Sequence, residues 1–147
     1  MTIDMRRALP ADIPAVLALY AQPSLDDGKV LDDDAAQQVY VQFSRYPNYR
    51  LFVAIEDGAV VGSYALLIMH NLAHCGTPSA IAEDVVVARA SQGQGIGRRM
   101  MAHALSEARS AGCYKLALSS NRKRTQAHAF YESLGFVQHG LSFVIEP

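Results

Sequence analysis

The pattern with the clearest chemical meaning is a glycine-rich turn that follows an apolar run and opens a helix-like segment. The run covers residues 85–87, and apolar residues recur at helical spacing from Ile96 to Ala108. Glycines let a ligand approach the backbone, and the first amides of a helix lack intrahelical acceptors at its positive end. The turn is therefore predicted to bind a phosphate or pyrophosphate. The predicted binding residues are Gln92, Gly93, Gln94, Gly95, Ile96, Gly97 and Arg98.

Two common nucleotide-binding motifs do not fit this turn. A Walker A loop requires Lys and then Ser or Thr after its last glycine, but Arg98 and Arg99 follow Gly97. The dinucleotide fingerprint requires one more residue between the glycines and an acidic residue after the next strand, and that strand ends at residues 119–121 without one. An ordinary helix entry with three glycines remains as the simpler alternative.

A third motif does fit. Residues 92–97, Gln-Gly-Gln-Gly-Ile-Gly, match Q/R-x-x-G-x-G/A, the acetyl-CoA motif of the GNAT N-acetyltransferase superfamily. Residues 127–136 resemble the A-x-x-F-Y-x-x-x-G-F signature of that superfamily, and residues 83–87 look like its central strand. Residues 112–115 and the pair Glu83-Asp84 are similar to glucosamine-6-phosphate N-acetyltransferases. One departure is Arg124, which stands where many members have an Asn that contacts CoA, and Asn121 could substitute for it.

The resemblance implies acetyl-CoA as the cosubstrate and assigns residues to it. The pantetheine arm is expected along Val85, Val86 and Val87, where that strand separates from the next one. The Val85 N–H is the expected donor to the oxyanion, and Phe130 in the second signature is expected to contact the cofactor. No metal is expected, although His70, His74 and Cys75 lie close together in the sequence.

The resemblance also implies the catalytic residues. Glu83 precedes the cofactor strand and is the candidate base, with an ordinary salt bridge as the structural alternative. Asp84 would lie on the opposite face of a regular strand, but a bulge could exchange the two roles. Tyr131 is the candidate general acid toward the leaving thiolate, and a core tyrosine is the alternative that helical spacing alone favours.

Hydrophobic periodicity and turn residues predict a single α/β domain over residues 1–147. The alternation of strands and helices indicates a mixed sheet with helices on both faces. The resemblance implies that this is the GNAT acyl-CoA N-acyltransferase fold, with a mostly antiparallel sheet and splayed middle strands. The expected strands are 2–9, 50–56, 59–69, 81–88, 113–119 and one or more from 135 onward, with a hairpin turn at Asp57-Gly58. The expected helices are 11–20, 32–45, one from the glycine turn to 110, and 125–134.

Composition restricts the remaining possibilities. The net charge of −1 gives no basic face for nucleic acid, and no apolar run approaches the ~20 residues of a membrane span. We therefore expect a cytoplasmic protein with no nucleic-acid or membrane partner, in which Cys75 and Cys113 are reduced thiols. His103 is expected on a solvated helix face.

The expected activity is acetyl transfer from acetyl-CoA to a primary amine of a small molecule in a ternary complex. Acetylation of a protein lysine or N-terminus, or CoA sensing without turnover, are the alternatives. Acidic residues before and within the second helix either cap that helix or attract a cationic acceptor: Asp26, Asp27, Asp32, Asp33 and Asp34. The resemblance also implies a possible homodimer, for which a final strand at residues 141–145 is the candidate interface.

Overall fold

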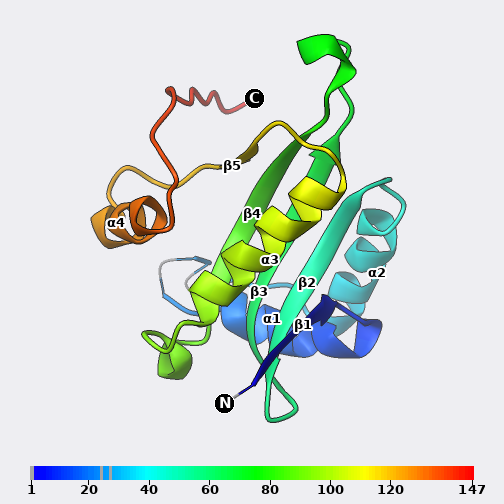
Figure 1. Cartoon of the computed structure of the whole chain (residues 1–147). Helices are drawn as coiled ribbons and strands as arrows, with labels where there is room; N and C mark the ends of the chain where they lie inside the picture. The colour runs from blue at the N-terminus through cyan, green and yellow to red at the C-terminus, as the bar shows by residue number, and fades with distance from the viewer. Residues whose placement is uncertain (1, 24, 27) are drawn as a thin grey trace. The chain divides into compact units, whose positions relative to one another are not determined.

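The computed structural model describes residues 2–23, 25–26 and 28–147 in two parts, Met1–Ala117 and Leu118–Pro147, each of which is described by itself. The first part contains strands β1 (Ile3–Arg7), β2 (Tyr49–Glu56), β3 (Ala59–Met69) and β4 (Ser79–Val87) and helices α1 (Ile13–Tyr20), α2 (Asp33–Phe43) and α3 (Ile96–Ser110) (Figure 1). Strand β5 (Leu116–Leu118) lies at the boundary, and α4 (Thr125–Ser133) belongs to the second part. Three short 3-10 helices complete the set: η1 (Pro10–Asp12), η2 (His74–Gly76) and η3 (Arg89–Ser91).

The sheet has the strand order β1-β2-β3-β4-β5, and the pairs from β1 to β4 are antiparallel. Asp57 and Gly58 connect β2 to β3 with φ angles of 50° and 78°, the left-handed conformations that a tight two-residue hairpin requires. The predicted hairpin is therefore confirmed, and β3 has the predicted bounds.

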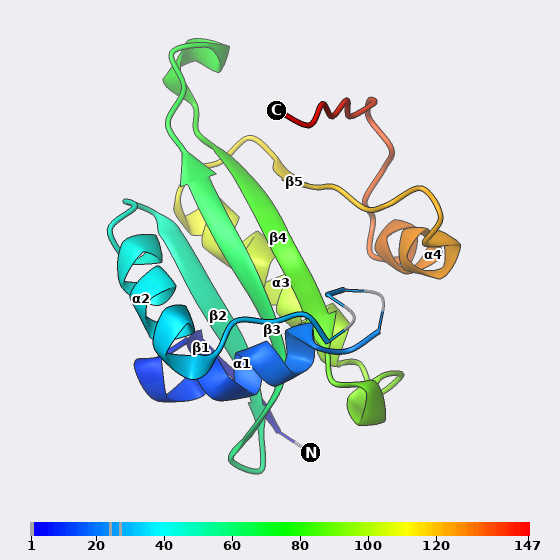
Figure 2. The same ribbon diagram turned by 180° about the vertical axis from the view of Figure 1, so that it is seen from behind.

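Helices cover both faces of this sheet. Helix α3 lies across one face, and α1 and α2 lie across the other, as the front and back views show (Figures 1 and 2). Alternate residues of the strands point to the two sides. The core on the α1–α2 side consists of Ala8, Ile13, Val16, Ala36, Leu51, Val53 and Ala65.

The α3 face is closely packed. A Cβ on Gly62 of β3 would lie 2.6 Å from the Met100 sulfur and 3.2 Å from the Val86 carbonyl oxygen, so this position has no room for a side chain. Tyr64 is fully buried, and its hydroxyl lies 2.6 Å from Nδ1 of His103 on α3. The prediction of a solvated His103 is therefore wrong: the ring is half-buried, and burial lowers its pKa.

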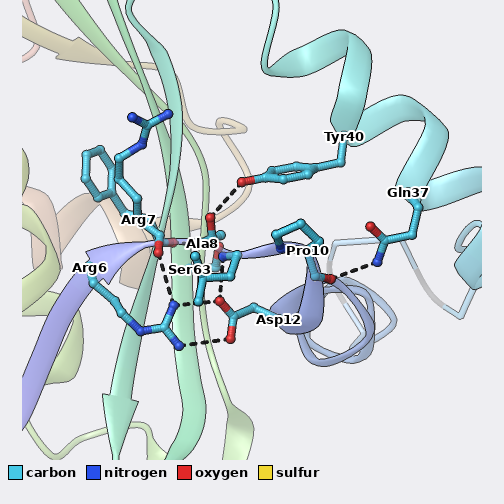
Figure 3. A network of polar contacts seen from close by, with 10 residues as sticks. Arg6, Arg7, Ala8, Pro10, Asp12, Gln37, Tyr40 and Ser63 are labelled. Carbon is cyan, nitrogen blue, oxygen red and sulfur yellow. Dashed lines mark hydrogen bonds and ion pairs between the residues drawn. The ribbon is translucent and has the colours of Figure 1, made fainter.

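Polar contacts hold the segment after β1 against α1 and α2. Asp12 accepts hydrogen bonds from both terminal nitrogens of Arg6, at 2.6 and 3.0 Å, and from the Leu9 N–H at 2.7 Å (Figure 3). The Tyr40 hydroxyl of α2 donates to the Ala8 carbonyl at 2.7 Å. Asp32 caps α2 by accepting from the Ala35 N–H at 2.8 Å, which confirms the predicted capping role.

The second part contains α4 and a C-terminal segment. The predicted strand from residue 135 onward is wrong, because residues 136–147, all of which the structure describes, adopt no regular secondary structure. A strand requires a neighbour for its backbone groups, whereas the apolar side chains of Leu141 and Phe143 are 86% and 91% exposed here. Strand β5 is also shorter than the predicted 113–119.

Candidate active site

Strand β4 has a bulge, where one more residue lies between two paired positions than on the facing stretch of β3. Two of its residues, Asp84 and Val85, lie opposite the single residue Tyr64 of β3. Asp84 has φ of 53°, the left-handed conformation found at the first position of one bulge type and tolerated by aspartate. The flanking pairs are Ala65 with Glu83 and Ser63 with Val86.

Backbone hydrogen bonds show the same bulge independently. The N–H of Ala80 donates to Lys115 O on the β5 side, at 3.0 Å, whereas the N–H of Ala88 donates to Val61 O on the β3 side, at 2.8 Å. Residues eight apart in a regular strand would point to the same edge. The extra residue therefore reverses which backbone groups of β4 point outward.

After the bulge, the backbone groups of Val85 and Val87 point away from β3. The N–H of Ala88 points toward β3, and the backbone groups of successive strand residues alternate between the two edges. The groups of Val87 and Val85 therefore point to the opposite edge, which we call the outer edge of β4. Val85 and Val87, which were predicted to bind the pantetheine arm, are half-buried and present N–H groups along this edge. The edge can pair with an extended ligand that contains amides.

The bulge also affects the two carboxylates that were considered as bases. The charges of both Asp84 and Glu83 raise the pKa of Tyr49 on β2, so both carboxylates lie near that tyrosine. In a regular strand these two neighbours would point to opposite faces. We predicted that Glu83 and Asp84 could exchange the role of base only if this strand has a bulge. The structure has that bulge.

The surroundings of Asp84 perturb its carboxyl group. Its pKa is raised, mainly because the surrounding protein displaces water from the carboxyl group, and further by the charge of Asp26. Its own charge in turn raises the pKa of Tyr20 at the end of α1, whose burial has the larger effect. Among the described residues, no cation lies within salt-bridge distance of Asp84. Asp27 lies outside the described residues.

The glycine turn leads from β4 into α3 as predicted. Gly93 and Gly95 have φ of 79° and 83°, and an added Cβ at either position would meet no atom within 4 Å. Gly95 is the N-cap of a 15-residue helix, and the first helical hydrogen bond is made by Arg99 N–H to Gly95 O. Within the described chain, no acceptor is found for the amides of residues 93–98. These amides form the anion-binding arrangement expected at a helix start.

Three side chains of the turn have different surroundings. Gln92 Nε2 donates to Val87 O at 3.2 Å, so its amide joins the turn to the end of β4. Arg98 is exposed beside the open amides. Arg99 donates instead to Ile3 O of β1 at 2.9 Å, so its guanidinium is bonded to the sheet.

Gln22, which follows α1, was not among the residues predicted from the sequence. Its side-chain amide contacts Val87 O and Arg89 N at the end of β4, 65 and 67 residues away along the chain. A glutamine after a helix is common, and no local pattern marks one that reaches across the fold. Only the structure could identify it.

The second part carries the other predicted site residues. Tyr131 is buried, its ring centroid lies 5.3 Å from that of Phe130 and 5.8 Å from that of Phe136, and burial raises its pKa. Asn121 Oδ1 accepts from the Lys123 N–H at 2.9 Å and shapes the turn before α4. The described residues contain no group of three or more His, Cys, Asp or Glu arranged to hold a metal ion. None of their helices is long and apolar enough to cross a membrane.

Comparisons with known proteins agree with this geometry. Residues 14–136 match the model of the acetyltransferase (GNAT) family. An aminoalkylphosphonate N-acetyltransferase of Salmonella typhimurium is 33% identical over 95% of this chain and 88% of its own length. A glucosamine 6-phosphate N-acetyltransferase of Trypanosoma brucei brucei is 36% identical over 61% of this chain and 59% of its own.

A solved structure shows the same fold. A putative acetyltransferase from Agrobacterium tumefaciens superposes with a TM-score of 0.91 at 38% identity, covering 98% of this chain and 99% of that one. The family match includes the bulged strand, the glycine turn and α4. The chain therefore belongs to the GNAT family of acetyltransferases and is an N-acetyltransferase.

Proposed function

We propose that this protein transfers the acetyl group of acetyl-CoA to a primary amine of a small molecule, within one domain and a ternary complex. The observation that carries the proposal is the set of unpaired amides at residues 93–98, next to the outer edge of β4. A diphosphate suits the amides, and an amide-containing pantetheine arm suits the edge. Bound there, acetyl-CoA would supply an activated acyl group as a thioester.

The Val85 N–H is proposed to stabilise the acetyl carbonyl oxygen as negative charge develops on it. It belongs to the bulge, where the outward direction of the backbone changes. The rigid strand holds the donor in place before the reaction, so little reorganisation is needed. Loss of one such donor typically costs about 2.7–4 kcal/mol of transition-state stabilisation.

The amine must lose a proton in order to attack. A lysine-like amine has a pKa near 10.4, so its neutral form lies about 3 units, or ~4–5 kcal/mol, uphill at pH 7. Glu83 and Asp84 are the proposed proton acceptors, and the raised pKa of Asp84 favours it, because a base that titrates nearer neutrality is more effective. As the new C–N bond forms and the C–S bond breaks, the amine proton passes to this carboxylate, directly or through water.

Tyr131 is proposed to donate a hydrogen bond to the leaving thiolate. The match of residues 127–136 to the family signature supports this role. Burial raises the pKa of its phenol, which makes complete proton transfer to a thiolate less favourable, so hydrogen-bond stabilisation describes the role better. Tyr131→Phe should lower kcat and leave acetyl-CoA affinity nearly unchanged, and an unchanged kcat would remove Tyr131 from the reaction.

A small cationic acceptor is the proposed substrate class. The charges of Asp84 and Asp26 raise the pKa of Tyr20, and those of Asp84 and Glu83 raise the pKa of Tyr49, so these groups lie near one another. Carboxylates and aromatic rings both favour a cationic amine. The relatives from Salmonella and Trypanosoma are named for an aminoalkylphosphonate and an amino sugar phosphate, which are small amines.

The decisive experiment is an acetyl-CoA turnover assay that detects released thiol. The panel would contain an aminoalkylphosphonate, glucosamine 6-phosphate, an aminoglycoside, a polyamine and lysine-containing peptides. We expect turnover of at least one small amine well above that of every peptide. Turnover of peptides alone would favour a protein acceptor, and binding of acetyl-CoA without any turnover would favour a sensor.

A further inference from the structure

Gln22 makes two hydrogen bonds to the backbone at the end of β4. Its Nε2 donates to Val87 O at 3.2 Å, and its Oε1 accepts from the Arg89 N–H at 2.7 Å. The partners determine the orientation of the amide, because a flipped group would place donor against donor and acceptor against acceptor. The side chain is half-buried.

The two contacts imitate a neighbouring strand. A strand residue presents one N–H and one C=O to the edge it pairs with, and a primary amide presents the same pair of groups. Val87 and Arg89 are two residues apart, the spacing at which backbone groups point to the same edge of a strand. Gln22 therefore occupies the end of the outer edge of β4 in place of a strand.

This position limits the length of edge that a ligand can use. Beyond the bulge, the outward groups are those of Val85 and Val87, followed by the N–H of Arg89. Val87 O already accepts from Gln22 and Gln92, and the Arg89 N–H is bonded to Gln22. The outward groups that neither Gln22 nor Gln92 occupies are those of Val85 and the N–H of Val87.

The turn also has hydrogen bonds that do not involve Gln22. The Ser91 N–H donates to Ala88 O at 2.8 Å, and the Gln92 side chain donates to Val87 O. The amides of residues 93–98 lie beyond these contacts, at the start of α3. Gln22 and Gln92 share the acceptor Val87 O, but the amides of residues 93–98 are not hydrogen-bond partners of Gln22.

We propose that Gln22 is a positioning residue that sets the register of the pantetheine arm along β4. It closes the end of the edge, so an arm anchored by its diphosphate at the turn can pair only with the groups of Val85 and Val87. This register places the thioester carbonyl at the Val85 N–H. The inference rests on the proposed function, because it requires CoA to bind at this edge.

The test compares ligands with and without the pantetheine arm. CoA and adenosine 3′-phosphate 5′-diphosphate, which keeps the diphosphate but lacks the arm, would be titrated calorimetrically into the wild type and into Gln22→Met. This substitution keeps the size of the side chain but loses both hydrogen bonds. We expect CoA to bind Gln22→Met about tenfold more weakly, with binding of the arm-free nucleotide unchanged within about twofold. Gln38→Met, an exposed glutamine on α2, is the matched control and should behave as the wild type.

A second variant separates the two hydrogen bonds. Gln22→Glu keeps an acceptor for the Arg89 N–H but offers Val87 O no donor, so it should lie between the wild type and Gln22→Met. An equal loss for both ligands would show that Gln22 only supports the turn, and no loss for CoA would show that it has no role; either result overturns the inference. Failure of the wild type to bind CoA would instead contradict the proposed function itself.

Discussion

Asp12, which follows β1, and Asp84, in β4, are carboxylates in opposite surroundings. Asp12 accepts two hydrogen bonds from Arg6 and one from the Leu9 N–H, and the hydrogen bonds from Arg6 are the main reason why its pKa is lowered. Asp84 has no cation within salt-bridge distance among the described residues, and desolvation raises its pKa. The charge of Asp12 is therefore balanced by its partners, whereas the charge of Asp84 remains available.

The difference has consequences of opposite sign for stability. A carboxyl group whose pKa is lowered on folding stabilises the fold above its unfolded pKa of about 3.9, and this stabilisation is lost as the pH falls through the folded value. A carboxyl group whose pKa is raised on folding makes the fold less stable as it ionises. Strained or unsatisfied groups of this kind are retained where they serve function.

The largest expected effect is on catalysis. Asp84→Asn keeps the size and the left-handed tendency of the residue but removes the charge, and it should lower kcat/KM about 10²–10⁴-fold if Asp84 is the base. Unfolding by denaturant should show equal or greater stability than the wild type, because an unpaired charge has been removed. Glu83→Gln is the matched control, and a larger loss of activity there would assign the base to Glu83.

A second substitution disturbs the strand that carries Asp84 without removing any charge. Gly62→Ala would place a Cβ against the Met100 sulfur and the Val86 carbonyl, and it should destabilise the fold by about 1–3 kcal/mol. Gly140→Ala, where a Cβ would meet nothing within 4 Å, is the control. Thermal unfolding would compare the midpoints of the two variants. Equal midpoints would show that Met100 and the β4 backbone can move to make room for the added methyl group.

Asp12→Asn removes a carboxylate whose charge is paired. Its effect on stability should be opposite in sign to that of Asp84→Asn. We expect a loss of about 1 kcal/mol in the free energy of unfolding at neutral pH, because Arg6 is partly exposed and the pair is screened by water. The loss should shrink as the pH falls through the folded pKa of Asp12, where the wild type also loses the charge. A difference that stays constant down to low pH would contradict the ion-pair explanation.

The smallest effect concerns a neighbour of Asp84. The charge of Asp26 contributes to the raised pKa of Asp84, so Asp26→Asn should move the acid limb of the kcat/KM profile to lower pH. The direction follows because a base remains ionised at lower pH once a nearby negative charge is removed. Asp34→Asn, in the first turn of α2, is the control, and a limb that moved equally in both variants would argue against Asp84 as the titrating group.

The sequence allowed prediction of the features that local signals encode. The turn residues Asp57 and Gly58 and the alternating strands around them predicted the hairpin, and Gly112 with φ of 76° ends α3 as expected. The glycine turn was predicted in the same way, because the residue types that mark a helix start or a left-handed position are adjacent in the sequence.

Long-range contacts were not predictable in this way. Gln22 pairs with residues more than 60 positions away, and His103 looked solvated because its buried partner Tyr64 belongs to a distant strand. The bulge could be stated only as a condition, since the count of residues between Glu83 and Val86 has meaning only against the register of β3. The final strand was predicted from the residue types in that segment. Strand propensity does not show whether a neighbouring strand is available to pair with it.

Binding of CoA by the amides of residues 93–98 and the outer edge of β4 underlies every role proposed for this site. Isothermal titration calorimetry of the folded chain with CoA measures this binding, with circular dichroism to verify folding. We expect a saturable binding isotherm with one CoA per chain. The absence of binding heat at millimolar CoA and at more than one temperature would contradict it.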